Sequence, residues 1–251
     1  MIPPILRKLL LYYWRDLICR RGNARYCPIC QHRSWKFTSY GVMRRPDARC
    51  PWCGSLERHR CEWLYLVRKT DLFDGRNKTV LHLAPEACLE TLFRQRFDKT
   101  YVTADLVDPH AMLRMDVMEI PFRADRFDVL LCSHVLANVS NDGTALSEFY
   151  RILKPGGWAI LLEDIQENPT FEDPVIADSK ERLRWYGHHD YVRRYGPDFI
   201  GRVQEAGFTV DIVAPQDIID PAEFALYGMA KAVDDIYYCK KLDNKDTISF
   251  F

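Results

Sequence analysis

Short apolar runs alternate with stretches of helical periodicity from residue 79 to residue 239, and this alternation limits the fold more than any other feature. The run 127–132 is uninterrupted, as in a strand that is buried on both faces of a sheet. Such alternation favours a mostly parallel, doubly wound α/β sheet. We expect an abrupt turn at 154–157, seven strands at 79–83, 100–104, 115–116, 127–132, 158–162, 208–213 and 235–239, and helices at 55–69, 86–97, 145–153 and 198–206.

Four cysteines near the start of the chain have the spacing C-x2-C-x19-C-x2-C, which is typical of a metal site. Two residues between the members of a pair allow both thiolates to bind one ion. Four thiolates form a closed tetrahedral site for Zn²⁺, with no open position for catalysis. The sequence therefore predicts a structural zinc ion in a zinc-ribbon-like module at residues 25–54, with the ligands Cys27, Cys30, Cys50 and Cys53.

Two disulfides, or four unrelated buried thiols, are the alternatives to zinc. Disulfides persist in oxidising compartments, and Arg7 and Lys8 interrupt what would be a secretory signal. The other five cysteines are scattered through predicted helices and strands, which suits a reducing cytoplasm. Zinc is the favoured prediction. We expect a cytoplasmic protein with no transmembrane segment, because no apolar run approaches about 20 residues.

Charge is unevenly distributed, although the net charge is zero. Residues 1–70 contain 15 Lys and Arg against 4 Asp and Glu, and the remainder contains 20 against 31. A basic N-terminal part favours an anionic partner, such as nucleic acid, a phosphorylated or nucleotide-linked substrate, or an acidic membrane surface. Residues 1–24 are predicted to form a basic amphipathic helix. That helix either packs against the protein, which is the ordinary case, or makes peripheral contact with a membrane.

Acidic residues follow two of the predicted strands, at the edge where sheets of this type bind ligands. Asp105 ends the second strand, and Asp116 follows the third. A carboxylate at the first position can bind both hydroxyls of a ribose, and a carboxylate at the second can bind an adenine amino group. The pair favours an adenosine-containing ligand over the alternative of two solvated turn carboxylates.

This part of the chain resembles the class I S-adenosylmethionine-dependent methyltransferases, in particular the group around the type 11 domain. The likeness extends from about residue 79 to residue 240. It depends on the order and spacing of TVLHLAPE (79–86), ADL (104–106), MDVMEIPF (115–122), RFDVLLCSHVL (126–136) and RILKPGGW (151–158). The chain also resembles a narrower bacterial set in which a cysteine knuckle module precedes this domain, with CGSLERHR (53–60) near the junction. The resemblance implies a seven-stranded Rossmann-like sheet, S-adenosylmethionine as cofactor and methyl transfer as the reaction.

The same resemblance assigns roles to individual positions. The loop after the first strand would face the methionine part of the cofactor, Asp105 would hold the ribose, and Asp116 would face the adenine. Ser133 and His134 would border the transferred methyl group. The cofactor-binding candidates are His82, Ala84, Pro85, Glu86, Asp105, Leu106, Asp116, Val117 and Ser133.

The segment 164–196 is a long connection within the domain expected at 79–241, which a helix and loop at 55–78 join to the cysteine module. Connections of that length are usually functional, and we predict a substrate lid. Arginines and aromatic residues accompany His188 and His189, so the segment could clamp an anionic acceptor and deprotonate it. The alternative is a packed lid with solvated charges. His134 is a third candidate base, with loop ordering as its alternative role.

Three functions are consistent with these features. The first is a methyltransferase that acts on an anionic small-molecule or glycan-type acceptor. The second is an RNA methyltransferase whose zinc module binds phosphate, because aromatic and basic residues are interleaved at 33–37 and Arg44 and Arg45 follow. The third is a non-catalytic zinc-adaptor protein, because the first loop, 83–86, contains no glycine. We rank them in this order.

Overall fold

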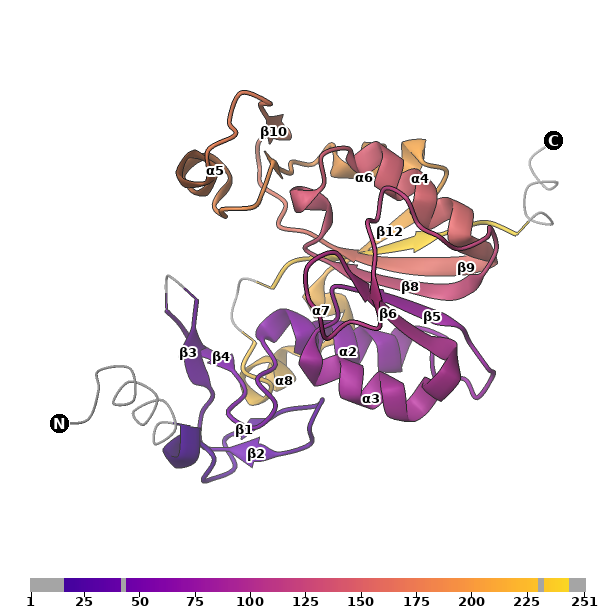
Figure 1. Cartoon of the computed structure of the whole chain (residues 1–251). Helices are drawn as coiled ribbons and strands as arrows, with labels where there is room; N and C mark the ends of the chain where they lie inside the picture. The colour runs from indigo at the N-terminus through magenta and orange to yellow at the C-terminus, as the bar shows by residue number, and fades with distance from the viewer. Residues whose placement is uncertain (1–15, 42–43, 230–232, 244–251) are drawn as a thin grey trace. The chain divides into compact units, whose positions relative to one another are not determined.

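The computed structural model describes residues 16–41, 44–229 and 233–243. Most of the amphipathic helix expected at residues 1–24, and with it the predicted membrane contact, lies outside these residues. The chain forms two compact units (Figure 1). The boundaries expected at 25–54, 55–78 and 79–241 stay a prediction, and the two units do not follow them. The first unit consists of Met1–Asp74, Glu86–Leu92 and Ala214–Val233, and the second of Gly75–Pro85, Phe93–Val213 and Asp234–Phe251.

The second unit contains the predicted doubly wound, mostly parallel seven-stranded sheet, so the fold class is confirmed. In order across the sheet, the strands are β12 (Thr209–Val213), β13 (Ile236–Lys240), β9 (Leu153–Leu162), β8 (Phe127–Ser133), β5 (Val80–Leu83), β6 (Tyr101–Asp105) and β7 (Leu113–Arg114). Parallel pairing joins β9 to β8, β8 to β5, β5 to β6 and β6 to β7, and β13 is antiparallel to both β9 and β12.

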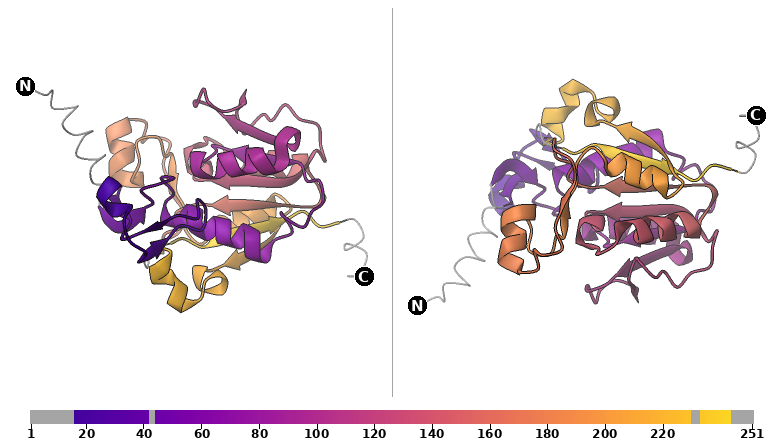
Figure 2. Two further views of the ribbon diagram at one scale, coloured as in Figure 1. Left: turned by 90° about the horizontal axis from the view of Figure 1, so that it is seen from below. Right: turned by 90° about the horizontal axis from the view of Figure 1, so that it is seen from above.

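Helices α4 (Asp142–Ile152) and α6 (Phe199–Glu205) lie side by side in the second unit (Figure 2). Strand β8 is buried at every position except the half-buried Asp128, as its apolar sequence predicts. Helix α4 begins three residues before its predicted start, because the Asn141 side chain accepts a hydrogen bond from Thr144 N (3.0 Å) and caps the helix.

The other described elements are short, apart from α2 (Glu57–Lys69) and α3 (Ala87–Phe97). The 3₁₀ turns η1 (Asp98–Thr100) and η2 (Leu136–Asn138) follow α3 and β8. The insertion 164–196 contains α5 (Ser179–Tyr186) and an antiparallel pair, β10 (Phe171–Glu172) with β11 (Arg193–Arg194).

The stretch 154–157 belongs to β9, so the abrupt turn predicted there was wrong. Gly156 N donates to Lys241 O (2.9 Å), and Lys241 N donates to Gly157 O (3.0 Å). Gly156 has a φ of +77°, and the register of β8 against β9 shifts nearby. The proline and glycines therefore make a strand irregular without ending it.

The first unit contains two antiparallel hairpins, β1 (Arg25–Tyr26) with β2 (Arg33–Ser34) and β3 (Thr38–Tyr40) with β4 (Arg45–Arg49). Its main helix is α2 (Glu57–Lys69), and two short helices, α7 (Pro215–Ile218) and α8 (Pro221–Leu226), were not predicted. Each short helix begins with a proline, which is a local signal for a helix start.

Arg60 of α2 is fully buried and joins three segments of the first unit. Its guanidinium group donates hydrogen bonds to the carbonyl oxygens of Ala48 (3.0 Å), Ser55 (2.8 Å), Tyr227 (2.7 Å) and Gly228 (2.9 Å). Burial lowers the pKa of Arg60 from its usual value, and nearby negative groups oppose this effect. The contacts hold the β4 strand, α2 and the end of α8 together.

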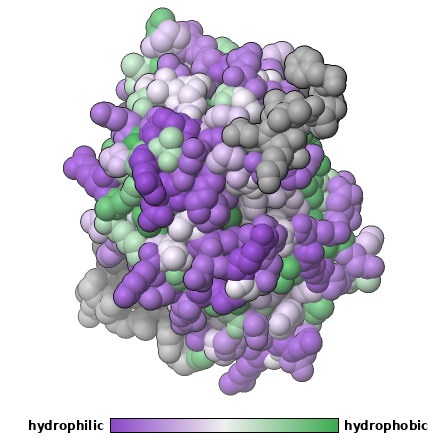
Figure 3. All heavy atoms as spheres, turned by 90° about the vertical axis from the view of Figure 1, so that its right-hand side faces the viewer, coloured by the Kyte–Doolittle hydropathy of each residue, from purple (hydrophilic) through white to green (hydrophobic). Residues whose placement is uncertain are grey.

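Among the described residues, no helix combines the length and apolar character needed to cross a membrane. The face drawn in Figure 3 is mostly hydrophilic, and its hydrophobic side chains form small, separate spots. Scattered exposed apolar residues are normal on protein surfaces and carry no functional meaning by themselves.

Candidate active site

A cavity of about 630 Å³ lies beyond the carboxyl ends of β5, β6 and β8 in the second unit. This volume is within the range of small-molecule sites, and doubly wound sheets bind ligands at this edge. Among the residues that line the cavity are seven candidates from the sequence: Ala84, Asp105, Leu106, Asp116, Val117, His134 and His188.

Asp105 and Asp116 each use one carboxylate oxygen to hold the turn that follows. Asp105 Oδ1 accepts hydrogen bonds from Val107 N (2.6 Å) and Asp108 N (2.7 Å). Asp116 Oδ1 accepts a hydrogen bond from Met118 N (2.8 Å). In the described part of the chain, Oδ2 of each residue makes no hydrogen bond, so it is available to a ligand. These turns fix the carboxylates before any ligand binds.

The loops after β5 and β8 both contain a non-glycine residue in the left-handed region. Ala84 has a φ of +46° and His134 a φ of +54°. Each is held by a backbone bond, from Ala84 N to Ala104 O (2.9 Å) and from His134 N to Leu162 O (2.8 Å). Such strain is concentrated at functional sites. The loop after β5 (83–86) therefore adopts at Ala84 a backbone conformation that is typical of glycine, although it contains no glycine.

The remaining cofactor candidates do not line this cavity. His82 is a core residue instead: it is fully buried, and its Nδ1 lies 2.8 Å from Tyr101 Oη. Because side chains alternate across a strand, His82 faces away from the side that its neighbours Leu81 and Leu83 occupy. That His82 contacts the cofactor stays a prediction, and in the described structure its side chain does not line this cavity. Pro85, Glu86, Ser133 and His189 are also absent from the described lining.

The insertion contributes His188 and Asp190 to the cavity. The Asp190 backbone N–H donates a hydrogen bond to His188 Nδ1 (3.3 Å), and Asp190 Oδ2 lies 3.7 Å from the same nitrogen, beyond hydrogen-bond distance. His189 turns elsewhere, because its Nδ1 lies 3.1 Å from Ser179 Oγ. Sequence reasoning missed Asp190, although an acid two residues after a histidine was a usable signal.

Glu163, at the end of β9, is buried behind the loop that follows β8. Its Oε1 accepts a hydrogen bond from Leu136 N (2.8 Å). Burial raises the pKa of Glu163 to about 8, and backbone hydrogen bonds from Leu136 and its two neighbours only partly oppose this rise. The carboxyl group is therefore mostly protonated at neutral pH.

Glu163→Gln is expected to remove part of the pH dependence of folding stability. A glutamate in the unfolded chain has a pKa of about 4.3, and the folded value is about 8. The wild type therefore loses stability as pH rises through this window, by at most about 1.4 kcal/mol per pH unit. Thermal unfolding between pH 5 and 8 should show the variant gaining on the wild type as pH rises. Glu167→Gln, on an exposed residue nearby, should follow the wild type; a constant difference for Glu163→Gln would contradict the assignment.

The four cysteines of the first unit form one cluster. Their Sγ atoms all lie within 4.8 Å of one another, with 3.6 Å between Cys27 and Cys53 and 3.8 Å between Cys30 and Cys50. Zn–S bonds of about 2.3 Å in a regular tetrahedron place the sulfurs about 3.8 Å apart. A disulfide requires about 2.05 Å. The cluster fits a four-thiolate metal site and does not fit two disulfides.

The two cysteine pairs have the same local geometry. Gln31 N donates to Cys27 O (2.8 Å), and Gly54 N donates to Cys50 O (3.0 Å). Gln31 and Gly54 both have positive φ, +59° and +75°. Trp52 N lies 3.5 Å from Cys50 Sγ, as expected when backbone N–H groups turn toward a metal-bound sulfur. Each pair therefore forms a tight knuckle.

Residues 74–161 match the family model described as a methyltransferase domain. The match covers about a third of the chain and includes the positions of Asp105, Asp116 and His134. The part of the sheet that borders the cavity is therefore similar in sequence to methyltransferase domains.

Two relatives that match part of the chain are also named as methyltransferases. The chain is 46% identical over 48 residues to a demethylmenaquinone methyltransferase of Streptomyces avermitilis, covering 19% of this chain and 21% of the relative. It is 35% identical over 99 residues to the ubiquinone/menaquinone biosynthesis C-methyltransferase UbiE of Cereibacter sphaeroides, covering 39% and 37%. The chain thus spans less than half the length of these curated relatives.

Among solved structures, the chain is similar to one chain of the complex between the Trm112 methyltransferase activator and a methyltransferase of Haloferax volcanii. The TM-score is 0.51 at 16% identity, and the match covers 74% of this chain and 91% of the other. At this identity the likeness concerns the fold alone.

Proposed function

We propose that this protein is an S-adenosylmethionine-dependent methyltransferase whose cofactor binds in the cavity at the ends of β5, β6 and β8. The observation that carries the proposal is the pair Asp105 and Asp116, which border one cavity and each keep a carboxylate oxygen for a ligand. The methyltransferase-domain match over this region supports it. In this assignment Asp105 holds the ribose hydroxyls, and Asp116 accepts a hydrogen bond from the adenine amino group.

The acceptor that we favour is a small molecule with an ionisable ring or hydroxyl group. The relatives are named as methyltransferases of menaquinone and ubiquinone biosynthesis, which supports an acceptor of this size and kind. His188 and Asp190 add polar groups to the same cavity.

The cofactor, when bound, supplies an electrophilic methyl group, so the protein must mainly orient the acceptor and remove its proton. His188 lines the cavity and is the first candidate to accept that proton, and His134, which also lines it, is the alternative base. An anionic small molecule or a glycan is also an acceptor that could be oriented and deprotonated in this way.

We further propose that Cys27, Cys30, Cys50 and Cys53 bind one structural zinc ion. The sulfur separations and the two knuckle turns support this assignment. Four thiolates leave no coordination position for substrate, so the metal would stabilise the module and take no part in methyl transfer.

An RNA acceptor is the second candidate. Trp35 is 55% exposed, with Lys36 Nζ 4.8 Å from the centroid of its ring, so a base could stack beside a cation. However, Phe37 is buried and Arg45 is bound to Glu57 Oε1 (3.2 Å), which removes two of the side chains expected to contact RNA. Binding to a single-stranded RNA oligomer that weakens steeply with salt would favour this candidate.

Calorimetric titration of the zinc-loaded protein with S-adenosylhomocysteine tests the cofactor site. Asp105→Ala is expected to weaken binding by about 100-fold, because charge-assisted hydrogen bonds to the ribose are lost. Asp108→Ala is the matched control, because Asp108 is exposed on the same loop and its Oδ1 holds only His110 N (2.9 Å). Equal affinities for the two variants would refute the ribose assignment. No binding to the wild type would favour the zinc-adaptor alternative.

A further inference from the structure

We propose that Arg193 is a positioning residue that fixes the wall segment, residues 136–140, to the insertion 164–196. The wall segment forms one side of the cavity through Asn138, Val139 and Ser140. The effect of Arg193 on ligand binding rests on the function proposed above, whereas its effect on the wall segment does not.

Arg193 lies in β11 and is only 3% exposed. Its Nη1 donates to Leu136 O (2.9 Å) and, through a short bond, to Val139 O, while its Nη2 donates to Ser140 O (3.1 Å). One guanidinium group thus binds three carbonyl oxygens of a single turn. A lysine could not reproduce this arrangement, because its ammonium group is a compact point charge without a planar fork of donors.

The wall segment is also held from its other side. Glu163 Oε1 accepts the Leu136 N–H, so buried side chains from two different elements bind the backbone of the same turn. The backbone of the insertion adds a further bond, from Val192 N to Ala137 O (2.8 Å). Among the described residues, the η2 turn has two backbone hydrogen bonds of its own, Asn138 N to Val135 O (2.9 Å) and Val139 N to Leu136 O (3.2 Å), and the external contacts outnumber them.

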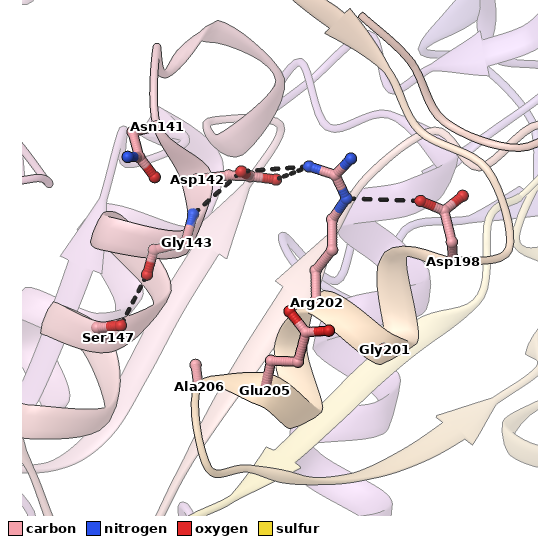
Figure 4. A pocket seen from close by; sticks show the side chains of 9 residues that line it. All are labelled: Asn141, Asp142, Gly143, Ser147, Asp198, Gly201, Arg202, Glu205 and Ala206. Carbon is pink, nitrogen blue, oxygen red and sulfur yellow. Dashed lines mark hydrogen bonds and ion pairs between the residues drawn. The ribbon is translucent and has the colours of Figure 1, made fainter.

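A carboxylate network anchors Arg193 in turn. Arg193 Nε donates to Glu172 Oε2 (2.9 Å) across the β10–β11 pair and lies 3.8 Å from Asp142 Oδ2. Arg202 of α6 binds the same two acids, at 3.1 Å to Asp142 Oδ2 and 2.8 Å to Glu172 Oε1. Figure 4 shows Arg202 pointing between Asp142 and Asp198. In the described structure Arg202 makes no hydrogen bond to the wall segment. It therefore has the same carboxylate partners as Arg193 but none of the contacts of Arg193 with the carbonyl oxygens of the wall segment.

Hydrogen exchange of the full-length, zinc-loaded protein without ligand separates these two roles. Arg193→Met is expected to accelerate exchange in peptides that cover 136–140 by at least about tenfold, with little change in β5. Arg202→Met should change exchange there by less than about threefold. Arg193→Lys should behave like Arg193→Met, because one ammonium group cannot bind three carbonyls.

Three results would overturn the inference: equal effects of Arg193→Met and Arg202→Met, wild-type exchange in Arg193→Lys, or a uniform acceleration that includes β5. If Arg193→Met does not fold, Arg193→Lys carries the test. In parallel, S-adenosylhomocysteine titration should show at least about tenfold weaker binding for Arg193→Met than for Arg202→Met. A wild type that does not bind this ligand would refute the proposed function, and the exchange data would still decide the role of Arg193.

Discussion

Cys50→Ser is expected to abolish zinc binding and to unfold the hairpins and knuckles of the first unit. Cys50 is fully buried, its Sγ lies 3.8 Å from Cys30 Sγ, and it accepts a contact from Trp52 N. A structural zinc site contributes about 10–16 kcal/mol of binding free energy in small zinc peptides, so losing one of four thiolates removes most of the stabilisation of such a module. Metal analysis should fall from about one equivalent of zinc to below about 0.1.

The control for this variant is Cys239→Ala, which changes a fully buried cysteine of β13 outside the cluster. It should keep one equivalent of zinc and lose only about 1 kcal/mol for the small cavity. Chelation of the wild type should reproduce the lower melting temperature of Cys50→Ser. A Cys50→Ser protein with a full equivalent of zinc would show that the cluster is not a four-thiolate site.

Arg60→Met is expected to lower the free energy of unfolding by about 4 kcal/mol. The substitution removes the Arg60 donor from four buried carbonyl oxygens, of which Ser55 O keeps a hydrogen bond from Cys50 N (2.9 Å). Each carbonyl that is left unsatisfied costs about 1–3 kcal/mol before relaxation. It also removes the cation that lies 4.6 Å from the centroid of the Phe37 ring. Urea denaturation monitored by tryptophan fluorescence measures the loss.

Arg68→Met, on the same helix, is the matched control. Arg68 lies near the surface, 33% exposed, and binds Glu223 Oε2 at 3.0 Å, so we expect a loss of about 1 kcal/mol or less. If the two variants lose similar stability, burial is not what makes Arg60 important.

The sheet could be predicted from the sequence because buried parallel strands leave a clear local pattern. The run 127–132 and the strand-ending Asp105 were readable without any tertiary information. The stretch 154–157 misled the prediction because its turn-forming residues are held in a strand by Lys241, which is far away in the chain. Local signals predict what a segment prefers, and a distant partner can override that preference.

The candidate site was predictable only where strand ends define it. Asp105 and Asp116 followed from the rule that ligands bind beyond the carboxyl ends of strands. His82 was named as a cofactor candidate from the resemblance alone, which does not consider the side of the strand that its side chain faces. The arginines of the insertion were predicted only as a clamp for an acceptor, and the backbone contacts of Arg193 and Glu163 were missed because their partners lie 57 and 27 residues away, a distance that no local motif encodes.

The buried contacts of Arg60 have a consequence for the order of events during protein synthesis. Two of its four acceptors, Tyr227 and Gly228, lie 167 and 168 residues further along the chain. The four cysteines can therefore come together early in synthesis, but the buried contacts of Arg60 stay incomplete until Gly228 has left the ribosome.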